Sequence, residues 1–292
     1  MSESNKSEIF YPSQEVIDQA NVSDYEALYN YSVTDREGFW AEQAETLSWY
    51  KKWDSVLDES NAPFYKWFNG ASINIVDNAI DRHLTNANRN KMAIMWEGEN
   101  GQVRNFSYQD LNYEVSQFAN ILKNLGVQKG EIVTIYMPQI PELVFAMLAC
   151  AKLGAMHSVV YGGFSTEALA SRIDDAQSKV LITADGGWRR GKQIDLKSIS
   201  NDAMDKAPSI EACVCVKNNE LDVEMKQGRD FWLHDLKQLP TSTGKCETVQ
   251  TSSEDPLFIL YTSGTTGKPK GMLHTHGGYA VYTSTTHRMA FD

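Results

Sequence analysis

The sequence predicts an α/β protein with a mainly parallel sheet flanked by helices, preceded by an aromatic-rich helical extension. From residue 92 onward, short apolar runs typical of buried strands alternate with segments of helical periodicity. Such alternation favours a parallel sheet covered by helices on both faces. Before residue 89 aromatic residues are frequent and there is little strand pattern. We therefore expect two regions, residues 1–88 and residues 89–292.

The composition is that of an acidic globular chain. Its 292 residues are 42% hydrophobic and 22% charged, which is enough to bury a sizeable core, and the formal net charge is −11. This charge argues against a nucleic-acid or membrane-surface binder. The four cysteines lack C-x-x-C spacing, and the N-terminal stretch has no apolar signal core. We expect reduced thiols and a soluble, cytoplasmic protein.

The predicted helices have recognisable ends. Asp35 is placed to cap a helix in the extension whose apolar stripe includes Phe39 and Trp40. Ser107 caps the first helix of the second region, which ends at Gly126. We expect strands at 92–96, 103–106, 132–137, 158–161, 180–183, 212–216 and 257–261, and helices over 107–126, 141–154, 166–176, 196–207 and from residue 279.

The last predicted strand leads into a polar loop. Residues 262–271 contain four hydroxyl side chains, three glycines and two lysines, with no acid among them. Backbone N–H groups, hydroxyls and lysines together suit a polyphosphate, although a polar turn between strands is the alternative. The loop is not a P-loop, because Thr262 stands where glycine is required and Pro269 follows Lys268.

Two glycine-containing turns follow earlier strands. Gly162 and Gly163 suit close approach of a ligand, or a tight turn with Ser165 as the helix cap. Residues 185–192 form the most basic short stretch of the chain, on a glycine-rich loop. Its three cations suit a phosphorylated ligand, and a solvated surface loop is the alternative.

Other candidates are interpreted as structural. His274 and His276 alternate on a predicted strand but lack a third metal ligand at a sensible spacing. Cys213 and Cys215 are expected in the core, and Asp174 and Asp175 are interpreted as surface charges. The candidate set contains no metal ligand.

Residues 261–271 resemble the signature loop of the AMP-forming acyl-CoA synthetases, the adenylate-forming family. Phe39-Trp40, residues 66–68 and residues 78–84 resemble the N-terminal extension of the acetyl-CoA synthetase type. The resemblance runs from about Tyr25 to Asp292. It implies that the fold is the first part of the large N-terminal AMP-binding domain of these enzymes, incomplete at its C-terminal end.

The resemblance also implies a function and its residues. Acetate or a similar short carboxylate would be activated with ATP, Mg²⁺ and CoA, through an acyl-adenylate. ATP phosphates would be bound by Thr262, Ser263, Gly264, Thr265, Thr266, Gly267, Lys268 and Lys270, with Lys268 catalytic. CoA would be bound by Gly163, Arg189, Arg190, Gly191 and Lys192. Lys192 departs from the family pattern, which has arginine there.

The resemblance covers only the first half or less of the family's enzyme. We therefore expect a fragment that is inactive alone and lacks the acyl pocket. A ligase for propionate, acrylate or a hydroxy acid is one alternative. A non-catalytic nucleotide-binding or regulatory protein is another. The sequence gives no indication of the oligomeric state.

Overall fold

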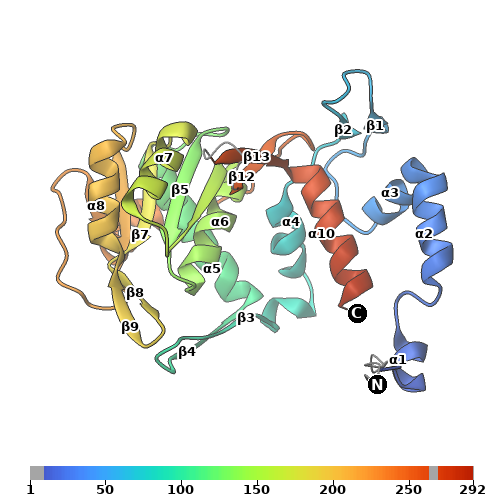
Figure 1. The fold of residues 1–292 in the computed structure, drawn as a ribbon, viewed down its shortest axis with the longest axis horizontal. Coiled ribbons are helices and arrows are strands. Elements are labelled where there is room, and N and C mark those ends of the chain that lie inside the picture. The colour runs from blue at the N-terminus through green and yellow to red at the C-terminus, as the bar shows by residue number, and fades with distance from the viewer. Residues whose placement is uncertain (1–9, 263–268, 292) are drawn as a thin grey trace, which may run out of the picture. The chain divides into compact units, whose positions relative to one another are not determined.

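The computed structural model describes residues 10–262 and 269–291. The chain divides into two compact units (Figure 1). One unit combines residues 1–47 with residues 280–292, and the other is Ser48–Tyr279. No helix in the described ranges combines the length and the apolar character needed to cross a bilayer.

The first unit is helical and rich in aromatic contacts. It contains α1 (Gln14–Gln19), α2 (Tyr25–Thr34), α3 (Arg36–Ala44) and most of α10 (His276–Ala290). The predicted cap of α3 is confirmed, because the Asp35 side chain accepts a hydrogen bond of 2.9 Å from the Gly38 N–H. Trp40 packs between Phe39 and Tyr282, with ring centroids 5.1 and 6.5 Å away. Aromatic side chains therefore form part of this unit's interior.

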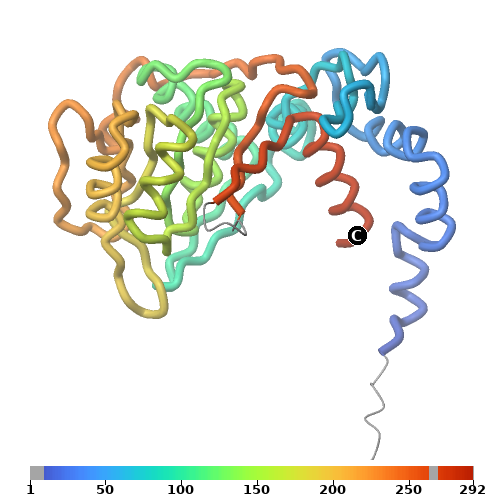
Figure 2. The backbone as a smooth tube through the Cα atoms, turned by 45° about the horizontal axis from the view of Figure 1, so that its top comes forward, coloured from blue at the N-terminus to red at the C-terminus, as the bar shows by residue number. Residues whose placement is uncertain are grey.

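The second unit is built on a seven-stranded sheet with the order β11-β10-β7-β5-β6-β12-β13. All neighbouring strands are parallel except β12 and β13, which form an antiparallel pair at one edge (Figure 2). The strands are β5 (Ile132–Met137), β6 (Met156–Tyr161), β7 (Val180–Ala184), β10 (Ala212–Val216), β11 (Asp230–Trp232), β12 (Pro256–Thr262) and β13 (Lys270–Thr275). The predicted, mainly parallel α/β fold is confirmed.

Helices cover both faces of this sheet. Successive side chains in a strand point to opposite faces, so neighbouring residues of one strand contact different helices. Ile135 faces the larger core, which includes α5 (Tyr108–Asn124) and α6 (Pro141–Leu153). The next residue, Tyr136, faces a smaller core under α7 (Thr166–Ala176) and α8 (Leu196–Lys206) (Figure 1). β7 and β10 alternate in the same way. Burial on both faces explains why these strands read as continuous apolar runs.

The predicted helix ends are largely confirmed. Ser107 and Asp110 form a reciprocal capping box at α5. Pro141 is the first residue of α6, and Gly154 ends that helix with φ +68°. Ser165 caps α7. One predicted helix begins earlier than expected, because α10 starts at His276 and not at Tyr279.

Several short elements are absent from the sequence prediction. They include β1 (Ser55–Asp58), β2 (Lys66–Asn69), α4 (Ile75–Ala79), β11, α9 (Leu233–Lys237), three 3-10 turns (Asp81–His83, Ala87–Asn90 and Pro240–Ser242), and the pair β8 (Gly186–Arg189) and β9 (Lys192–Asp195). The predicted strands β3 (Met92–Glu97) and β4 (Val103–Ser107) form a separate hairpin. Such elements of three to six residues carry too little periodicity to be read from sequence.

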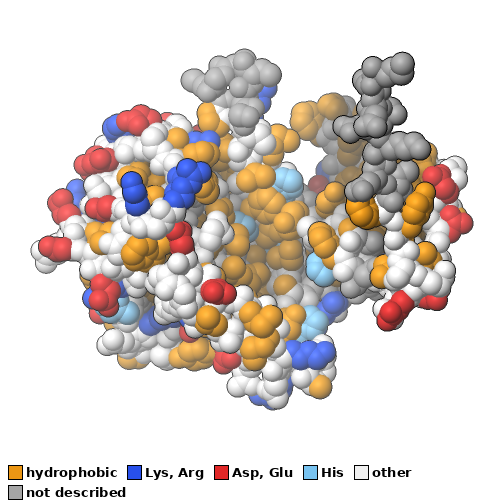
Figure 3. Space-filling model, turned by 60° about the horizontal axis from the view of Figure 1, so that its bottom comes forward, with side chains coloured by type: hydrophobic (Ala, Val, Ile, Leu, Met, Phe, Trp, Pro, Cys, Tyr) orange, Lys and Arg blue, Asp and Glu red, His pale blue; other side chains and the backbone are white. Residues whose placement is uncertain are grey.

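On the face shown in Figure 3, charged side chains of both signs occur in small groups separated by neutral and apolar atoms. All four cysteines are free and buried.

His157 and His276 are buried near the β6–β12 junction. The ring of His157 stacks on the Phe258 ring with centroids 5.4 Å apart, and the ring of a third histidine, His274, stacks on the same phenylalanine at 4.4 Å. Burial, together with the neighbouring His276, lowers the pKa of His157 to about 3. The pKa of His276 is lowered to about 4. Burial is the main cause, Asp255 raises the pKa, and Lys129 lowers it. Both imidazoles are therefore neutral in the folded protein at pH 7.

These pKa values predict a loss of stability in mild acid. Each folded-state pKa lies below the ordinary value of 6.5, so the unfolded chain binds more protons as the pH falls from 6.5 toward 4. From pH 7.5 to pH 5.5 we expect the two histidines to lower the free energy of unfolding by about 1.5 kcal/mol each. Urea unfolding at the two pH values measures this. The double variant His157→Phe, His276→Gln should have a smaller pH dependence, and an unchanged dependence would contradict the assignment.

Candidate functional site

A cavity lies where the parallel strands end. β5 and β7 are neighbours in the sheet. The chain after β5 leads to β6 on one side of this pair, whereas the chain after β7 leads to β10 on the other side. In open parallel sheets this reversal leaves a crevice at the carboxyl ends of the strands, and ligands bind there. The cavity at this edge has a volume of about 290 Å³.

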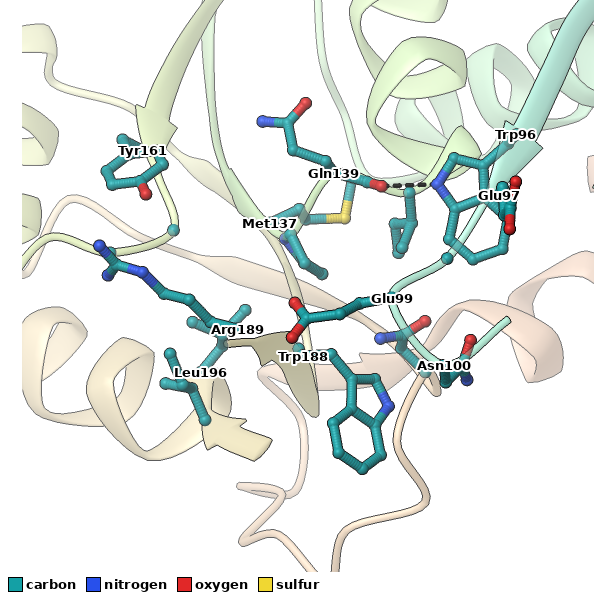
Figure 4. A pocket seen from close by; sticks show the side chains of 18 residues that line it. Trp96, Glu97, Glu99, Asn100, Met137, Gln139, Tyr161, Trp188, Arg189 and Leu196 are labelled. Atoms are coloured by element: carbon teal, nitrogen blue, oxygen red, sulfur yellow. Dashed lines mark hydrogen bonds between the residues drawn. The ribbon is translucent and has the colours of Figure 1, made fainter. Parts of the chain in front are cut away.

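The cavity wall combines five segments of the second unit, which meet only through folding (Figure 4). Apolar atoms make up most of the wall. The lining residues are Trp96, Glu97, Gly98, Glu99 and Asn100 at the end of β3 and in the turn that follows; Met137, Pro138, Gln139 and Ile140 at the end of β5 and after it; Tyr161, Gly162 and Gly163 at the end of β6 and after it; Gly187, Trp188, Arg189, Ile194 and Leu196 in the β8–β9 hairpin and at the start of α8; and Asn218 after β10.

Residues 186–195, predicted as a basic loop, form a β-hairpin instead. β8 and β9 are antiparallel, and Arg189 pairs directly with Lys192 across a two-residue turn. The turn residues Arg190 and Gly191 have φ values of +53° and +72°, which is the backbone that two-residue hairpins require. Directly paired side chains lie on the same side of a hairpin. The turn therefore places Arg189 beside Lys192, and the spacing of the two cations follows from its length.

The hairpin brings Arg189 to the predicted glycine turn. The Arg189 guanidinium lies over the Tyr161 ring, 5.5 Å from its centroid. A Cβ atom on Gly163 would lie 2.5 Å from Arg189 Nη1 and 2.6 Å from Tyr161 Cε1, closer than such atoms ever pack. Glycine is thus needed at position 163 for this arrangement. Two of the predicted CoA-binding residues, Gly163 and Arg189, are neighbours at the cavity.

The cations of the hairpin are available for an anion. Within residues 10–262 and 269–291, Arg189, Arg190 and Lys192 form no ion pair. Arg190 and Lys192 are exposed. Three cations without an ion-pair partner among the described residues, beside a largely apolar cavity whose wall also includes Glu97 and Glu99, suit a ligand with both a phosphate and a flat or apolar part.

Asp185 anchors the base of the hairpin, a role that its sequence context does not reveal. Its fully buried carboxylate accepts hydrogen bonds from the N–H groups of Gly186, Asn218 and Asn219 at 2.7, 2.8 and 2.9 Å. It also accepts one from Leu221 at 3.0 Å. The carboxylate therefore joins the start of the hairpin to the segment after β10. The only feature of the sequence that could have indicated this anchor is a single acid at the start of a glycine-rich stretch.

Removing this carboxylate should destabilise the fold. Asp185→Ala leaves several buried N–H groups without an acceptor, and we expect the free energy of unfolding to fall by about 3 kcal/mol. Urea unfolding measures this change. The control Asp222→Ala removes an exposed carboxylate nearby and should change the free energy by less than about 0.5 kcal/mol. Equal effects of the two substitutions would show that Asp185 is not an anchor.

The opposite wall is held by Trp96 and Arg104. The Trp96 indole N–H donates a hydrogen bond of 2.7 Å to the carbonyl oxygen of Gln139, which fixes the β3–β4 hairpin against the loop after β5. Arg104 forms a two-pronged ion pair with Glu142 at 2.6 and 3.0 Å. Nothing in the sequence pattern relates these positions, because they lie on separate elements.

Only the ends of the predicted phosphate loop fall within the described residues. Thr262 ends β12, Lys270 begins β13, and the two are cross-strand partners. β12 runs parallel to β6, so Thr262 lies at the sheet edge where the cavity opens. Ser263, Gly264, Thr265, Thr266, Gly267 and Lys268 lie outside the described residues. The chain after Pro269 is extended, because β13 begins at Lys270.

The end of β12 is held to α7. The Tyr261 hydroxyl donates a hydrogen bond of 2.6 Å to Asp175, and Arg172 lies over the Tyr261 ring at 5.6 Å. Burial, together with Asp175, raises the pKa of this tyrosine. Asp174 and Asp175 are exposed, as expected of surface charges, and Asp175 in addition holds the end of β12 through this hydrogen bond.

The two candidate histidines separate in the structure. His274 is on β13, whereas His276 is the first residue of α10 and is buried. The predicted shared strand was wrong at His276. In the part of the chain that is described, no three His, Cys, Asp or Glu side chains are grouped to hold a metal ion.

Comparison with protein families gives two matches. Residues 81–291 match the model described as AMP-binding enzyme. Residues 25–79 match the model described as Acetyl-coenzyme A synthetase N-terminus. The first of these matches covers more than half of the chain.

Several curated relatives and a solved structure are similar over nearly all of this chain. Acetyl-coenzyme A synthetase of Magnetococcus marinus is 48% identical over 93% of the chain and 42% of the relative. That of Bdellovibrio bacteriovorus is 46% identical over 98% of the chain and 45% of the relative. Acetoacetyl-CoA synthetase from Streptomyces lividans superposes with a TM-score of 0.85 at 25% identity, covering 94% of this chain and 44% of that one. The chain thus spans less than half the length of these proteins.

Proposed function

The chain belongs to the family of AMP-binding enzymes, and from this premise we propose that it supplies the CoA-binding and ATP-phosphate-binding region of an acetate–CoA ligase. The match at residues 25–79 and the 45–48% identity to several acetyl-coenzyme A synthetases support acetate as the substrate. The similarity to the acetoacetyl-CoA synthetase, at 25% identity, is weaker.

The proposed reaction has two steps. A carboxylate oxygen of acetate attacks the α-phosphorus of ATP, and pyrophosphate leaves, giving acetyl-adenylate. The sulfur of CoA then attacks the acyl carbon, the thiol proton is lost to water, and AMP leaves. The first step is needed because a carboxylate is a poor electrophile, whereas AMP is a good leaving group.

The region between β12 and β13 is proposed to serve the first step. Negative charge develops on the β- and γ-phosphates as pyrophosphate leaves, and fixed donors and cations stabilise it. Thr262 and Lys270 stand opposite each other at the sheet edge, so the loop between them starts and ends there. The hydroxyls, glycines and Lys268 of the loop provide the donor set.

The hairpin and the glycine turn are proposed to serve the second step. The observation that carries this assignment is the cavity beside Arg189, Arg190 and Lys192, three cations that form no ion pair among the described residues although Glu97 and Glu99 line the same cavity. CoA carries several phosphates and a flat adenine, which fit three cations and an apolar wall. Gly163 leaves room for the Arg189 side chain, and Gly191 allows the turn.

Mg²⁺ is proposed to bind with ATP, because the cation neutralises part of the phosphate charge. The proposed partners are therefore a small carboxylate, ATP and CoA, and neither a nucleic acid nor a membrane. A cytoplasmic location remains a prediction. The boundary between an extension over residues 1–88 and the AMP-binding domain from residue 89 is likewise proposed.

The test is carboxylate-dependent release of AMP by the full-length gene product. Incubation with Mg·ATP, CoA and acetate should give AMP at about one per second or faster. Propionate, acrylate and a hydroxy acid should react more slowly. A faster rate with one of them would favour the alternative ligases, and no AMP with any acid would favour a non-catalytic nucleotide-binding protein. The 292-residue chain alone should release none.

A further inference from the structure

The tip of the basic hairpin is held by a residue from another hairpin. Gly191 donates its backbone N–H to Glu99 Oε1, and Glu99 lies in the turn between β3 and β4. Figure 4 shows the Glu99 side chain reaching from that turn toward the hairpin that carries Trp188 and Arg189. The two hairpins therefore meet at the rim of the cavity.

The tip has little other support. β8 and β9 have four residues each, and a two-stranded hairpin of this size is marginally stable in water. Asp185 anchors only the base. For residues 190–192, Glu99 is the one hydrogen-bond partner from outside the hairpin among the described residues. The position of the tip relative to the cavity thus depends on this bond.

We propose that Glu99 is a positioning residue that fixes the hairpin tip, so that Arg189 and Lys192 face a phosphate of CoA at the cavity. This inference rests on the proposed CoA site and adds to it a residue that touches no reacting atom. The Arg189 and Lys192 side chains are long, and a fixed backbone reduces the entropy lost when they bind an anion.

The charge of Glu99 makes the role testable. A carboxylate close to bound phosphate weakens binding through repulsion, so electrostatics alone would favour a neutral side chain at this position. The bond to the Gly191 N–H needs only an acceptor oxygen, which glutamine also has. Glu99→Gln therefore removes the repulsion and keeps the bond, whereas Glu99→Ala removes both.

The first experiment measures the bond itself. Arg190-Gly191 is the only Arg-Gly pair in the sequence, so labelling arginine carbonyls with ¹³C and glycine nitrogens with ¹⁵N yields one filtered NMR signal, from the Gly191 N–H. We expect Glu99→Ala to accelerate hydrogen exchange of this N–H about tenfold, and Glu99→Gln to leave it nearly unchanged.

The second experiment measures CoA. In the full-length gene product we expect Glu99→Ala to raise the KM for CoA about fivefold, whereas Glu99→Gln should keep or lower it. Acetate-dependent ATP–pyrophosphate exchange, which needs no CoA, should stay unchanged in both variants. The control Glu220→Ala removes an exposed carboxylate in the segment after β10 that forms no hydrogen bond among the described residues, and the KM should change less than twofold.

Two outcomes would overturn the proposal. If Gly191 exchange were unchanged in Glu99→Ala, Glu99 would not hold the tip. If Glu99→Ala and Glu99→Gln lowered the KM for CoA equally, Glu99 would act through charge alone. A different result would show that the proposed CoA site is wrong. In that case Arg189→Glu would leave the KM for CoA unchanged, whereas Glu99→Ala would still accelerate hydrogen exchange at Gly191. Glu99 would then hold the hairpin tip without a role in CoA binding.

Discussion

Arg189→Glu is expected to raise the KM for CoA about 100-fold in the full-length gene product. The substitution places a carboxylate where the structure has a guanidinium over the Tyr161 ring at the cavity. Replacing attraction to a phosphate by repulsion costs several kcal/mol when the site is partly desolvated. Steady-state kinetics with varied CoA measures the change.

The control separates the two half-reactions. Acetate-dependent ATP–pyrophosphate exchange in Arg189→Glu should remain near the parent rate, because that step does not involve CoA. Lys192→Arg should leave the KM for CoA unchanged or lower it, since the guanidinium fork binds phosphate through two donors. Lost exchange together with an unchanged KM would assign the hairpin to ATP or to the fold.

Lys268→Ala is expected to slow acetate-dependent ATP–pyrophosphate exchange about 100-fold or more. The reason is the loss of a positive charge that would stabilise the departing pyrophosphate, and the removal of one such contact typically has this effect. Lys268 lies outside the described residues, so this prediction rests on the sequence of the loop and on family membership.

Two further variants control for charge and for global effects. Lys268→Arg keeps the positive charge and should retain more activity than Lys268→Ala. Lys91→Ala removes an exposed lysine elsewhere in the second unit and should leave exchange unchanged. An unchanged rate in Lys268→Ala would mean that the loop does not hold the phosphates of ATP.

Much of the fold could be predicted, because its signals are local. The strands Ile132–Met137 and Val180–Ala184 are apolar on both faces, and the helices between the strands have caps such as Ser107 and Gly154. Short elements escaped prediction because they lack such local signals. The hairpin of residues 186–195 contains no apolar alternation, and its pairing depends on two residues with positive φ.

The candidate site was only partly predictable. Gly163 and Arg189 were identified as members of separate stretches through a resemblance, and the structure brings them into contact at one cavity. Asp185 and Glu99 escaped notice because a carboxylate that accepts backbone N–H groups has no sequence signature of its own.

The sequence by itself determined the α/β class, the parallel strands, the helix ends and the family. Each depends on residues near one another in the chain, through periodicity, capping and short motifs. Only the tertiary structure decided that Arg189 lies over Tyr161, that Asp185 anchors its hairpin and that Glu99 holds the tip. These contacts join segments far apart in the sequence, and they are set by the order of strands in the sheet, because strand order determines which loops meet at its carboxyl edge.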